Sequence, residues 1–273
     1  MLFLKLCLAD ELSRLNDIVF NSDYRLLSSL DAWTIAFGFG LQIYFDFSGY
    51  SHMAIGISRI IGLPIKENFC FPYLSKSATE FWRRWHISLS SWVNDYLYFY
   101  LNLRLPVWFY GSVPLLLTWG IMGLWHGSSW RFVIWGFLNG CFVLIHRLYK
   151  ISLSKYRFLN FLSNPIISWL ITLFTTMSTW IYFRESKWQQ ANILFLKLWE
   201  FDLNLNLREN YYLFVCIFSL GTLFSGLIWQ NKNKPFIKQV ISNKLSSFLS
   251  CVACLFFSII FIKRQVAFIY FQF

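Results

Sequence analysis

Charged residues are scarce in this chain. Only 14% of its 273 residues are Asp, Glu, Lys or Arg, whereas soluble domains average about 25%. Hydrophobic residues make up 57% of the chain and aromatic residues 22%, and the mean hydropathy is +0.49. This composition excludes an ordinary soluble enzyme and indicates an integral membrane protein.

The few charges are also unevenly placed. Four stretches contain no Asp, Glu, Lys or Arg: 105–130, 158–183, 210–231 and 245–262. Each is long enough, or nearly so, for a helix to cross an apolar layer of about 30 Å. We predict spans at about 106–126, 128–148, 165–183, 211–229 and 245–262. The expected fold is all-α: a polytopic transmembrane bundle with amphipathic and re-entrant helices, in a single domain covering residues 1–273.

Motifs of several other protein classes are missing. The chain has no GxSxG, P-loop or GxGxxG motif, and His52, His86, His126 and His146 lack the spacing of metal ligands. Cys251-Val-Ala-Cys254 lies in an apolar stretch and is interpreted as packing. The net charge of +11 falls in short loops, where it sets orientation. We therefore expect no bound cofactor or metal, and a lipid bilayer rather than nucleic acid as partner.

Basic loops predict the orientation of the spans. Residues 147–157 and 231–244 each carry four basic residues and no acid, which places both on the cytoplasmic side. Residues 184–210 hold four basic and four acidic residues, as expected for the opposite side. The chain is predicted to be a multi-pass protein of the inner or plasma membrane.

A histidine stands near the end of the first charge-free stretch, in Gly123-Leu124-Trp125-His126-Gly127. An ionisable residue inside a membrane segment is a functional-site hypothesis by default. Histidine titrates near neutral pH, so His126 could take a proton from a hydroxyl nucleophile and later return it. The alternative, a histidine that only hydrogen-bonds a neighbouring helix, stays open on this motif alone.

A second group of polar residues interrupts the apolar segment 31–63. It includes Tyr44, Asp46 and Ser48, with several glycines nearby. Because the segment is too long for one simple span, we predict a membrane helix that breaks near Asp46–Gly49. Irregular backbone at membrane depth is tolerated only where protein or a water-filled cavity covers it.

A third group follows a helix start at Ser77, where Ser77-Ala-Thr-Glu80 matches a capping box. Five apolar or aromatic residues then recur at helical spacing, which predicts one interfacial helix: Phe81, Trp85, Leu89, Trp92 and Tyr96. Arg83 and Arg84 lie beside this stripe. Either is expected to pair with Asp46, with a purely structural ion pair as the alternative reading.

Together these blocks resemble the membrane-bound O-acyltransferase family, above all its bacterial branch of alginate O-acetyltransferase membrane subunits and teichoic acid D-alanyl transfer proteins. The blocks that carry the resemblance are Gln42–Tyr50, Pro64–Tyr73, Phe81–Ser90, Asp95–Tyr98, Gly123–Gly127 and the closing Phe268–Phe273.

The resemblance implies transfer of an acyl group, acetyl as first choice, from a thioester donor to a hydroxyl of an extracellular or cell-wall polysaccharide. Acyl-CoA or an acyl-carrier protein is the expected co-substrate. The acceptor would be reached directly or through a periplasmic or extracellular partner acyltransferase. His126 would be the general base and His86 a second catalytic residue. Six residues would shape the substrate funnel: Asp46, Arg83, Arg84, Trp125, Tyr44 and Ser48.

The chain departs from the family pattern in places. The family usually has several spans before the position of Met1, so an N-terminal part is expected to be missing. His52 stands where an Asp is usual, and Asn94 replaces a common Arg. Two other readings follow: an inactive remnant or interaction protein, and a transporter for a polar solute, for which no internal repeat is found.

Overall fold

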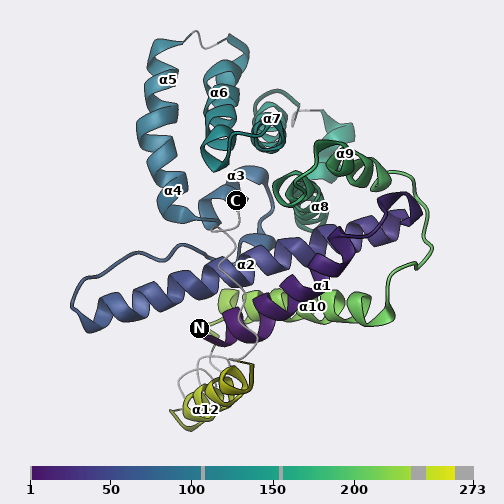
Figure 1. The fold of residues 1–273 in the computed structure, drawn as a ribbon. Coiled ribbons are helices and arrows are strands. Elements are labelled where there is room, and N and C mark those ends of the chain that lie inside the picture. Colours follow the sequence, from purple (N-terminus) through teal and green to yellow (C-terminus); the bar gives the residue numbers. More distant parts are fainter. Residues whose placement is uncertain (1, 106–107, 154–155, 235–243, 262–273) are drawn as a thin grey trace. The chain divides into compact units, whose positions relative to one another are not determined.

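The computed structural model describes residues 2–105, 108–153, 156–234 and 244–261. Within these ranges every regular element is a helix (Figure 1), which confirms the predicted all-α class. The chain forms two compact units. The first unit comprises Met1–Asp23, Phe37–Glu67 and Leu205–Phe273, and the second comprises Tyr24–Ala36 and Asn68–Asn204.

Among the described residues, the first unit contains η1 (Leu4–Ala9), α1 (Asp10–Phe20), the later part of α2 (Ser29–Ile60), α10 (Glu209–Gln230) and α12 (Lys244–Phe261). Phenylalanines join them edge to face. Phe20 meets Phe39 at 6.1 Å between ring centroids, and Phe45 meets Phe218 at 6.2 Å. The spans predicted at 211–229 and 245–262 are helices, α10 and α12, and α10 is long and apolar enough to cross a membrane.

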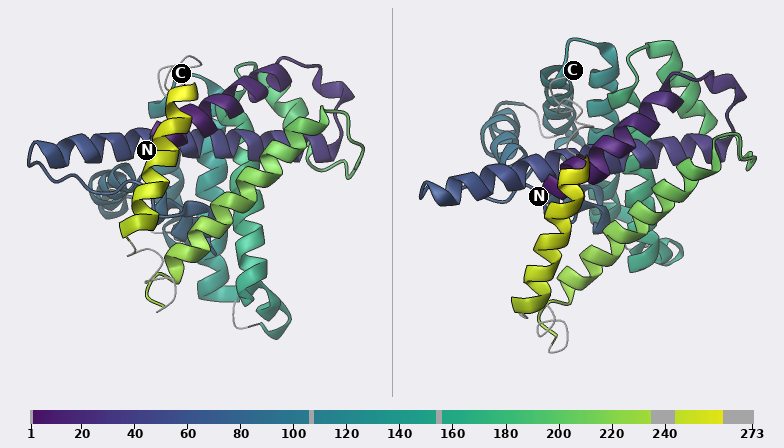
Figure 2. Two further views of the ribbon diagram at one scale, coloured as in Figure 1. Left: turned by 90° about the horizontal axis from the view of Figure 1, so that it is seen from below. Right: turned by 60° about the horizontal axis from the view of Figure 1, so that its bottom comes forward.

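Helix α2 runs without a break from Ser29 to Ile60, and both views of Figure 2 show it as one rod. The predicted break near Asp46–Gly49 is therefore wrong. A glycine costs a helix only about 1 kcal/mol, and an unbroken helix keeps its backbone groups paired. The Asp46 carboxylate meets a cation instead: Lys5 Nζ lies 2.9 Å from Asp46 Oδ1 and 2.8 Å from Asp10 Oδ1.

A second polar contact holds α1, α2 and α10 together inside the first unit. Asn16 Nδ2 donates to Gln42 Oε1 at 2.7 Å, and Tyr211 Oη donates to Asn16 Oδ1 at 2.6 Å. All three side chains are buried. Gly38 permits this approach, because a Cβ at that position would lie 2.4 Å from Tyr211 Oη.

The second unit begins with η2 (Tyr24–Leu26) and the first turns of α2. The others follow: η3 (Pro72–Leu74), α3 (Ala78–Arg84), α4 (Ile87–Trp92), η4 (Val93–Tyr98), α5 (Phe99–Arg104), α6 (Trp108–His126), α7 (Trp130–Leu148), η5 (Tyr149–Leu153), η6 (Arg157–Ser163), α8 (Pro165–Arg184) and α9 (Trp188–Lys197). Helices α6 and α7 form a hairpin, and α7 also packs against α8. Within the described residues, helices lie where spans were predicted at 106–126, 128–148 and 165–183, and those of the last two ranges are long and apolar enough to cross a membrane.

Glycines allow α6 and α7 to touch backbone to backbone. A Cβ on Gly123 would lie 2.2 Å from the carbonyl oxygen of Phe132, and one on Gly136 would lie 2.2 Å from that of Trp119. A Cβ on Gly140 would meet the Trp119 side chain at 2.9 Å. Small residues at such crossings are how membrane helices gain close packing. The hairpin therefore fixes the position of the end of α6.

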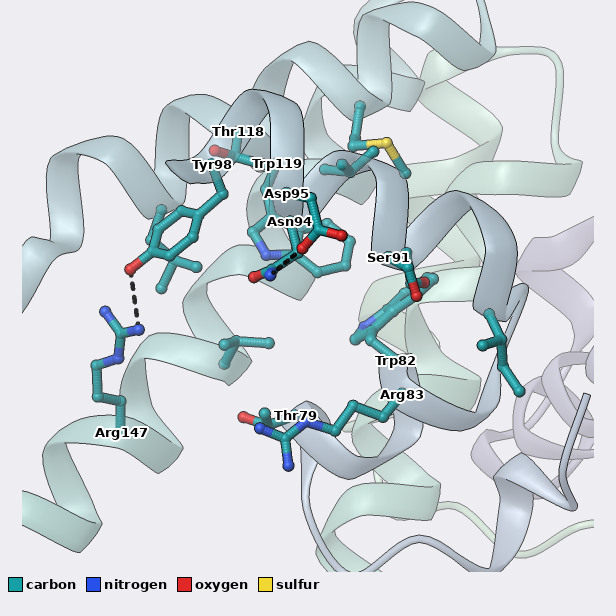
Figure 3. Close-up of a pocket in the computed structure, with 16 residues that line it drawn as sticks. Thr79, Trp82, Arg83, Ser91, Asn94, Asp95, Tyr98, Thr118, Trp119 and Arg147 are labelled. Carbon is teal, nitrogen blue, oxygen red and sulfur yellow. Dashed lines mark hydrogen bonds between the residues drawn. The ribbon is translucent and has the colours of Figure 1, made fainter. Parts of the chain in front are cut away.

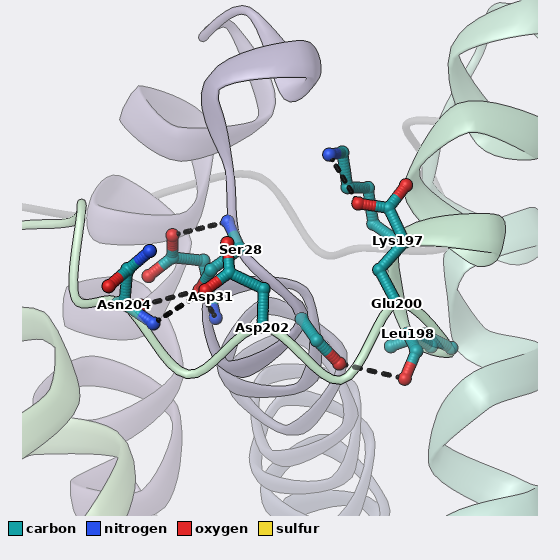
Figure 4. A network of polar contacts seen from close by, with 8 residues as sticks. Ser28, Asp31, Lys197, Leu198, Glu200, Asp202 and Asn204 are labelled. Atoms are coloured by element: carbon teal, nitrogen blue, oxygen red, sulfur yellow. Dashed lines mark hydrogen bonds and ion pairs between the residues drawn. The ribbon is translucent and has the colours of Figure 1, made fainter.

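The start of α2 is tied to the segment after α9 by hydrogen bonds (Figure 4). Ser28 Oγ donates to the Asn204 carbonyl at 2.5 Å, and Ser29 Oγ donates to the Leu198 carbonyl at 2.8 Å. Asp31 Oδ2 accepts from the Ser28 amide at 2.8 Å, which caps the helix start.

Three helices of the described residues are long and apolar enough to cross a membrane: Trp130–Ile151, Pro165–Arg184 and Glu209–Gln230. This supports the predicted membrane protein.

Candidate active site

The helix predicted over the aromatic stripe is interrupted at one point. Helix α3 ends at Arg84, Trp85 is extended, and His86 adopts a left-handed conformation with φ 44° and ψ 56° before α4 begins at Ile87. The prediction of one continuous helix is therefore wrong. A left-handed non-glycine residue costs about 1–3 kcal/mol and is often found at functional sites. The break falls between Trp85 and Leu89 of the predicted stripe.

A loop before α3 holds this break open. The Cys70 amide donates to the Arg84 carbonyl at 3.0 Å, and the Ile87 amide donates to the Asn68 carbonyl at 3.0 Å. Asn68 Oδ1 accepts from both the amide and the hydroxyl of Ser88, at 3.1 and 2.7 Å. The backbone groups that a continuous helix would have paired thus find partners in residues 68–70.

The start of α3 accounts for one of the two predicted arginines. Ser77 Oγ accepts from the Glu80 amide at 3.1 Å, which confirms Ser77 as the N-cap. The Glu80 carboxylate accepts from the Lys76 amide at 2.7 Å and pairs with Arg84 at 2.6 Å. Glu80 is thus an ion-pair partner of Arg84, and Lys5 of η1 is an ion-pair partner of Asp46. The sequence predicts instead that Asp46 pairs with Arg83 or Arg84.

Aromatic rings surround His126 at the end of α6. Its ring centroid lies 5.0 Å from Trp125, 5.0 Å from Trp135 and 5.1 Å from Phe183, and all three rings stand edge to face with it. The side chain is half-buried. The imidazoles of His86 and His126 are near enough to interact electrostatically. The two histidines that the sequence singled out thus lie in the same unit, within the range of an electrostatic interaction.

A buried arginine that sequence reasoning missed holds one wall of this cage. Arg131 is 9% exposed, and its Nη1 donates to the carbonyls of Phe183 and Glu185 at 2.9 and 3.1 Å. Its guanidinium lies over the Phe132 ring at 4.1 Å. Tyr24 in turn donates to the Glu185 carboxylate. The one sequence signal was a lone arginine at the start of an apolar helix, five residues after His126.

The electrostatics of His86 differ from those of a surface histidine. Burial lowers the pKa of His86 from 6.5 to about 4. Its Nδ1 lies 3.5 Å from the Ser88 hydroxyl. At neutral pH the ring is therefore uncharged, and it can accept or donate a hydrogen bond without bringing a charge into the site.

A pocket of about 450 Å³ lies between the α3–η4 segment and the α6–α7 hairpin (Figure 3). Arg83 and Arg147 reach it from two sides, and Arg147 Nη2 donates to Tyr98 Oη at 3.0 Å. Trp82 and Trp119 line it and stand 4.7 Å apart. Both indoles also belong to the aromatic cluster that contains Trp135, so the pocket and the histidine cage share a wall.

The remaining predicted residues divide between the units. The second unit holds His86, His126, Arg83, Arg84 and Trp125. Trp125 is 62% exposed beside His126. Tyr44, Asp46 and Ser48 belong to the first unit and are buried there. Their part in a substrate funnel stays a prediction.

The family comparison covers most of the chain. Residues 2–186 match the MBOAT, membrane-bound O-acyltransferase family. The chain belongs to this family. The blocks from Gln42 to Gly127 lie inside the matched range, whereas α10 and α12 lie beyond it.

Curated relatives match between 45% and 70% of the chain. It is 41% identical over 171 residues to "Probable alginate O-acetylase AlgI" of Azotobacter vinelandii, covering 63% of this chain and 33% of that protein. It is 36% identical over 190 residues to "Peptidoglycan O-acetyltransferase" of Helicobacter pylori, covering 70% and 35%. It is 32% identical over 133 residues to "Teichoic acid D-alanyltransferase" of Bacillus subtilis, covering 45% and 33%. The chain thus spans about a third of the length of these relatives.

Proposed function

We propose that this membrane-bound O-acyltransferase family member carries the reaction centre for transfer of an acyl group, acetyl first, from a thioester to a hydroxyl of an extracellular or cell-wall polysaccharide. The observation that carries the proposal is the aromatic cage around His126, with His86 in electrostatic reach. The names of the relatives supply three candidate acceptors: alginate, peptidoglycan and teichoic acid.

His126 serves as the general base in this proposal. The acceptor hydroxyl attacks the thioester carbonyl carbon while His126 takes the hydroxyl proton. The new C–O bond forms, the C–S bond breaks, and the departing thiolate receives that proton from His126. General base catalysis of this kind contributes about 10²–10⁴-fold to a rate. The surrounding rings exclude water, which protects the thioester from hydrolysis.

His86 and the arginine pocket take supporting roles. A neutral His86, held in place by the helix break, positions the donor or the acceptor by hydrogen bonding. Acyl-CoA and acyl-carrier protein both present a phosphate-bearing arm, and Arg83 and Arg147 are suited to attract such phosphates. Arg84, Trp125, Tyr44, Asp46 and Ser48 shape the route that leads substrates to the centre.

The protein acts as a multi-pass enzyme of the inner or plasma membrane. Its basic loops, residues 147–157 and 231–244, face the cytoplasm, where thioester donors are made. The acyl group leaves on the opposite side. It passes either directly to a polysaccharide hydroxyl or to a periplasmic or extracellular partner acyltransferase.

A transfer assay tests the function. Membranes containing the chain are given labelled acetyl-CoA or acetylated carrier protein, together with alginate, peptidoglycan or teichoic acid. We expect His126→Ala to lower transfer by about 10²–10⁴-fold while the protein still accumulates, because only the base is removed. His52→Ala is the matched control, since His52 lies in the first unit beside Glu67. Unchanged transfer by His126→Ala would overturn the proposal.

A further inference from the structure

Two buried tryptophans have no hydrogen-bond partner for their indole N–H. Trp135 and Trp180 are each 1% exposed, and within the described residues neither Nε1 meets an acceptor. Elsewhere in the second unit the chain satisfies this group: Trp33 Nε1 donates to the Leu198 carbonyl at 3.1 Å, and Trp169 Nε1 donates to that of Tyr73 at 2.8 Å. An unpaired buried donor costs about 1–3 kcal/mol, so the two exceptions require an explanation.

Both indoles lie within the aromatic cluster that reaches His126. The Trp135 ring lies 5.0 Å from that of His126. The Trp180 ring lies 5.0 Å from that of Trp85, the residue that precedes His86. The two indoles stack on each other, with centroids 6.0 Å apart and planes at 28°. The two unpaired donors therefore belong to the same cluster as the cage around His126.

Resting on the proposed function, we propose that Trp135 and Trp180 hydrogen-bond the carbonyl oxygen of the acyl thioester and stabilise the oxyanion formed from it. When the hydroxyl attacks, the C=O electron pair moves onto this oxygen, and it returns as the C–S bond breaks. Neutral N–H dipoles aimed at an oxygen that gains charge only during the reaction favour the transition state over the bound substrate.

The chemistry of the cluster favours a carbonyl over other ligands. An indole is a donor only, so its partner must be an acceptor. A phosphate or carboxylate, which is charged before any reaction, is better matched by an arginine. A packing role alone does not explain the tryptophans, since phenylalanine would fill much of the same space without burying an unpaired N–H.

Nuclear magnetic resonance of the indole N–H groups tests the proposal on the full chain. The chain is labelled with ¹⁵N-tryptophan in a mild detergent and mixed with the ketone analogue of acetyl-CoA, in which a methylene replaces the thioester sulfur. We expect the Trp135 and Trp180 indole protons to shift downfield. The indole of Trp199, which is 52% exposed at the end of α9, should not move. Trp→Phe variants assign the three signals.

Kinetics of the same variants supply the second readout. Trp135→Phe should lower kcat by roughly 10²–10³-fold, the effect of losing one oxyanion donor, with little change in KM. Trp199→Phe should match the unsubstituted chain. If Trp135→Phe does not fold, β-(3-benzothienyl)alanine at position 135 replaces the N–H with sulfur and keeps the ring shape; the same loss of kcat is expected.

The outcomes separate this proposal from the function it rests on. An active chain whose Trp135 and Trp180 signals ignore the analogue, or whose kcat survives loss of the Trp135 N–H, overturns the indole proposal and leaves the transfer function intact. An inactive chain whose two indole signals shift supports carbonyl binding and overturns the proposed function.

Discussion

In the first unit, buried charges meet one another: Lys5 lies 2.8 Å from Asp10 and 2.9 Å from Asp46. In the second unit, the buried centre is a cluster of aromatic rings around His126, and the indole N–H groups of Trp135 and Trp180 have no partner among the described residues. The difference separates two uses of polarity in an apolar protein. Paired polar groups hold helices together, whereas the unpaired indole donors near His126 are the ones we propose a substrate carbonyl to meet.

The largest effect should come from breaking the charge cluster of the first unit. Lys5→Met leaves two buried carboxylates without their cation, which should cost about 3–5 kcal/mol of unfolding free energy. The measurement is chemical unfolding of the purified chain in a mild detergent. Lys197→Met is the control, because its pair with Glu200 at 2.6 Å is half-exposed on the glutamate side and should contribute about 0–1 kcal/mol. Equal losses in the two variants would show that the Lys5 cluster is solvated and does not hold the unit together.

The spans were predictable because local composition marks them. The four charge-free runs mark α6, α8, α10 and α12. The motif blocks also single out His86 and His126, whose catalytic roles stay a prediction. In each case the signal lies within the segment itself, so neighbouring residues are enough to read it.

The wrong or missed predictions share a different cause. In each case a segment distant in the sequence supplies an ion-pair or hydrogen-bond partner. The break expected in α2 does not occur, and Lys5 of η1 pairs with Asp46 there. The break at His86 does occur because residues 68–70 bind the backbone on both sides of it. Arg131 was missed because its partners are backbone carbonyls at the end of α8, which leave no pattern in the sequence.

An intermediate effect should follow from separating the helices that position His126. Gly136→Ala places a Cβ 2.2 Å from the Trp119 carbonyl oxygen, so α6 and α7 must move apart. We expect a loss of about 1–3 kcal/mol in stability and a fall in acyl transfer, because the cage around His126 loosens. Gly120→Ala is the matched control, since its Cβ would meet nothing within 4 Å and should add helix stability of up to about 1 kcal/mol. Equal stability and equal acyl transfer in the two variants would show that α6 and α7 are not closely packed where they cross.

The smallest predicted effect is a loss of folding stability at acid pH, and it is tested with one histidine from each unit. In the folded chain burial lowers the pKa of His86 from 6.5 to about 4. Above pH 6.5 the ring is neutral in both states, so the full stability is present. As the pH falls from 6.5 towards 4, the unfolded chain binds a proton that the folded chain refuses, and stability declines; below that window both states are protonated and the decline stops.

His86→Asn should remove this part of the acid sensitivity, because asparagine tolerates the left-handed backbone and does not titrate. The measurement is the difference in Tm between about pH 7 and about pH 5, inside the window in which only the unfolded chain gains the proton. The variant should lose less stability on acidification than the unsubstituted chain. His52→Asn in the first unit is the control for removing a histidine elsewhere. If His52→Asn reduces the acid sensitivity as much as His86→Asn, the effect does not belong to the His86 ring, and the predicted link between its lowered pKa and acid stability is wrong.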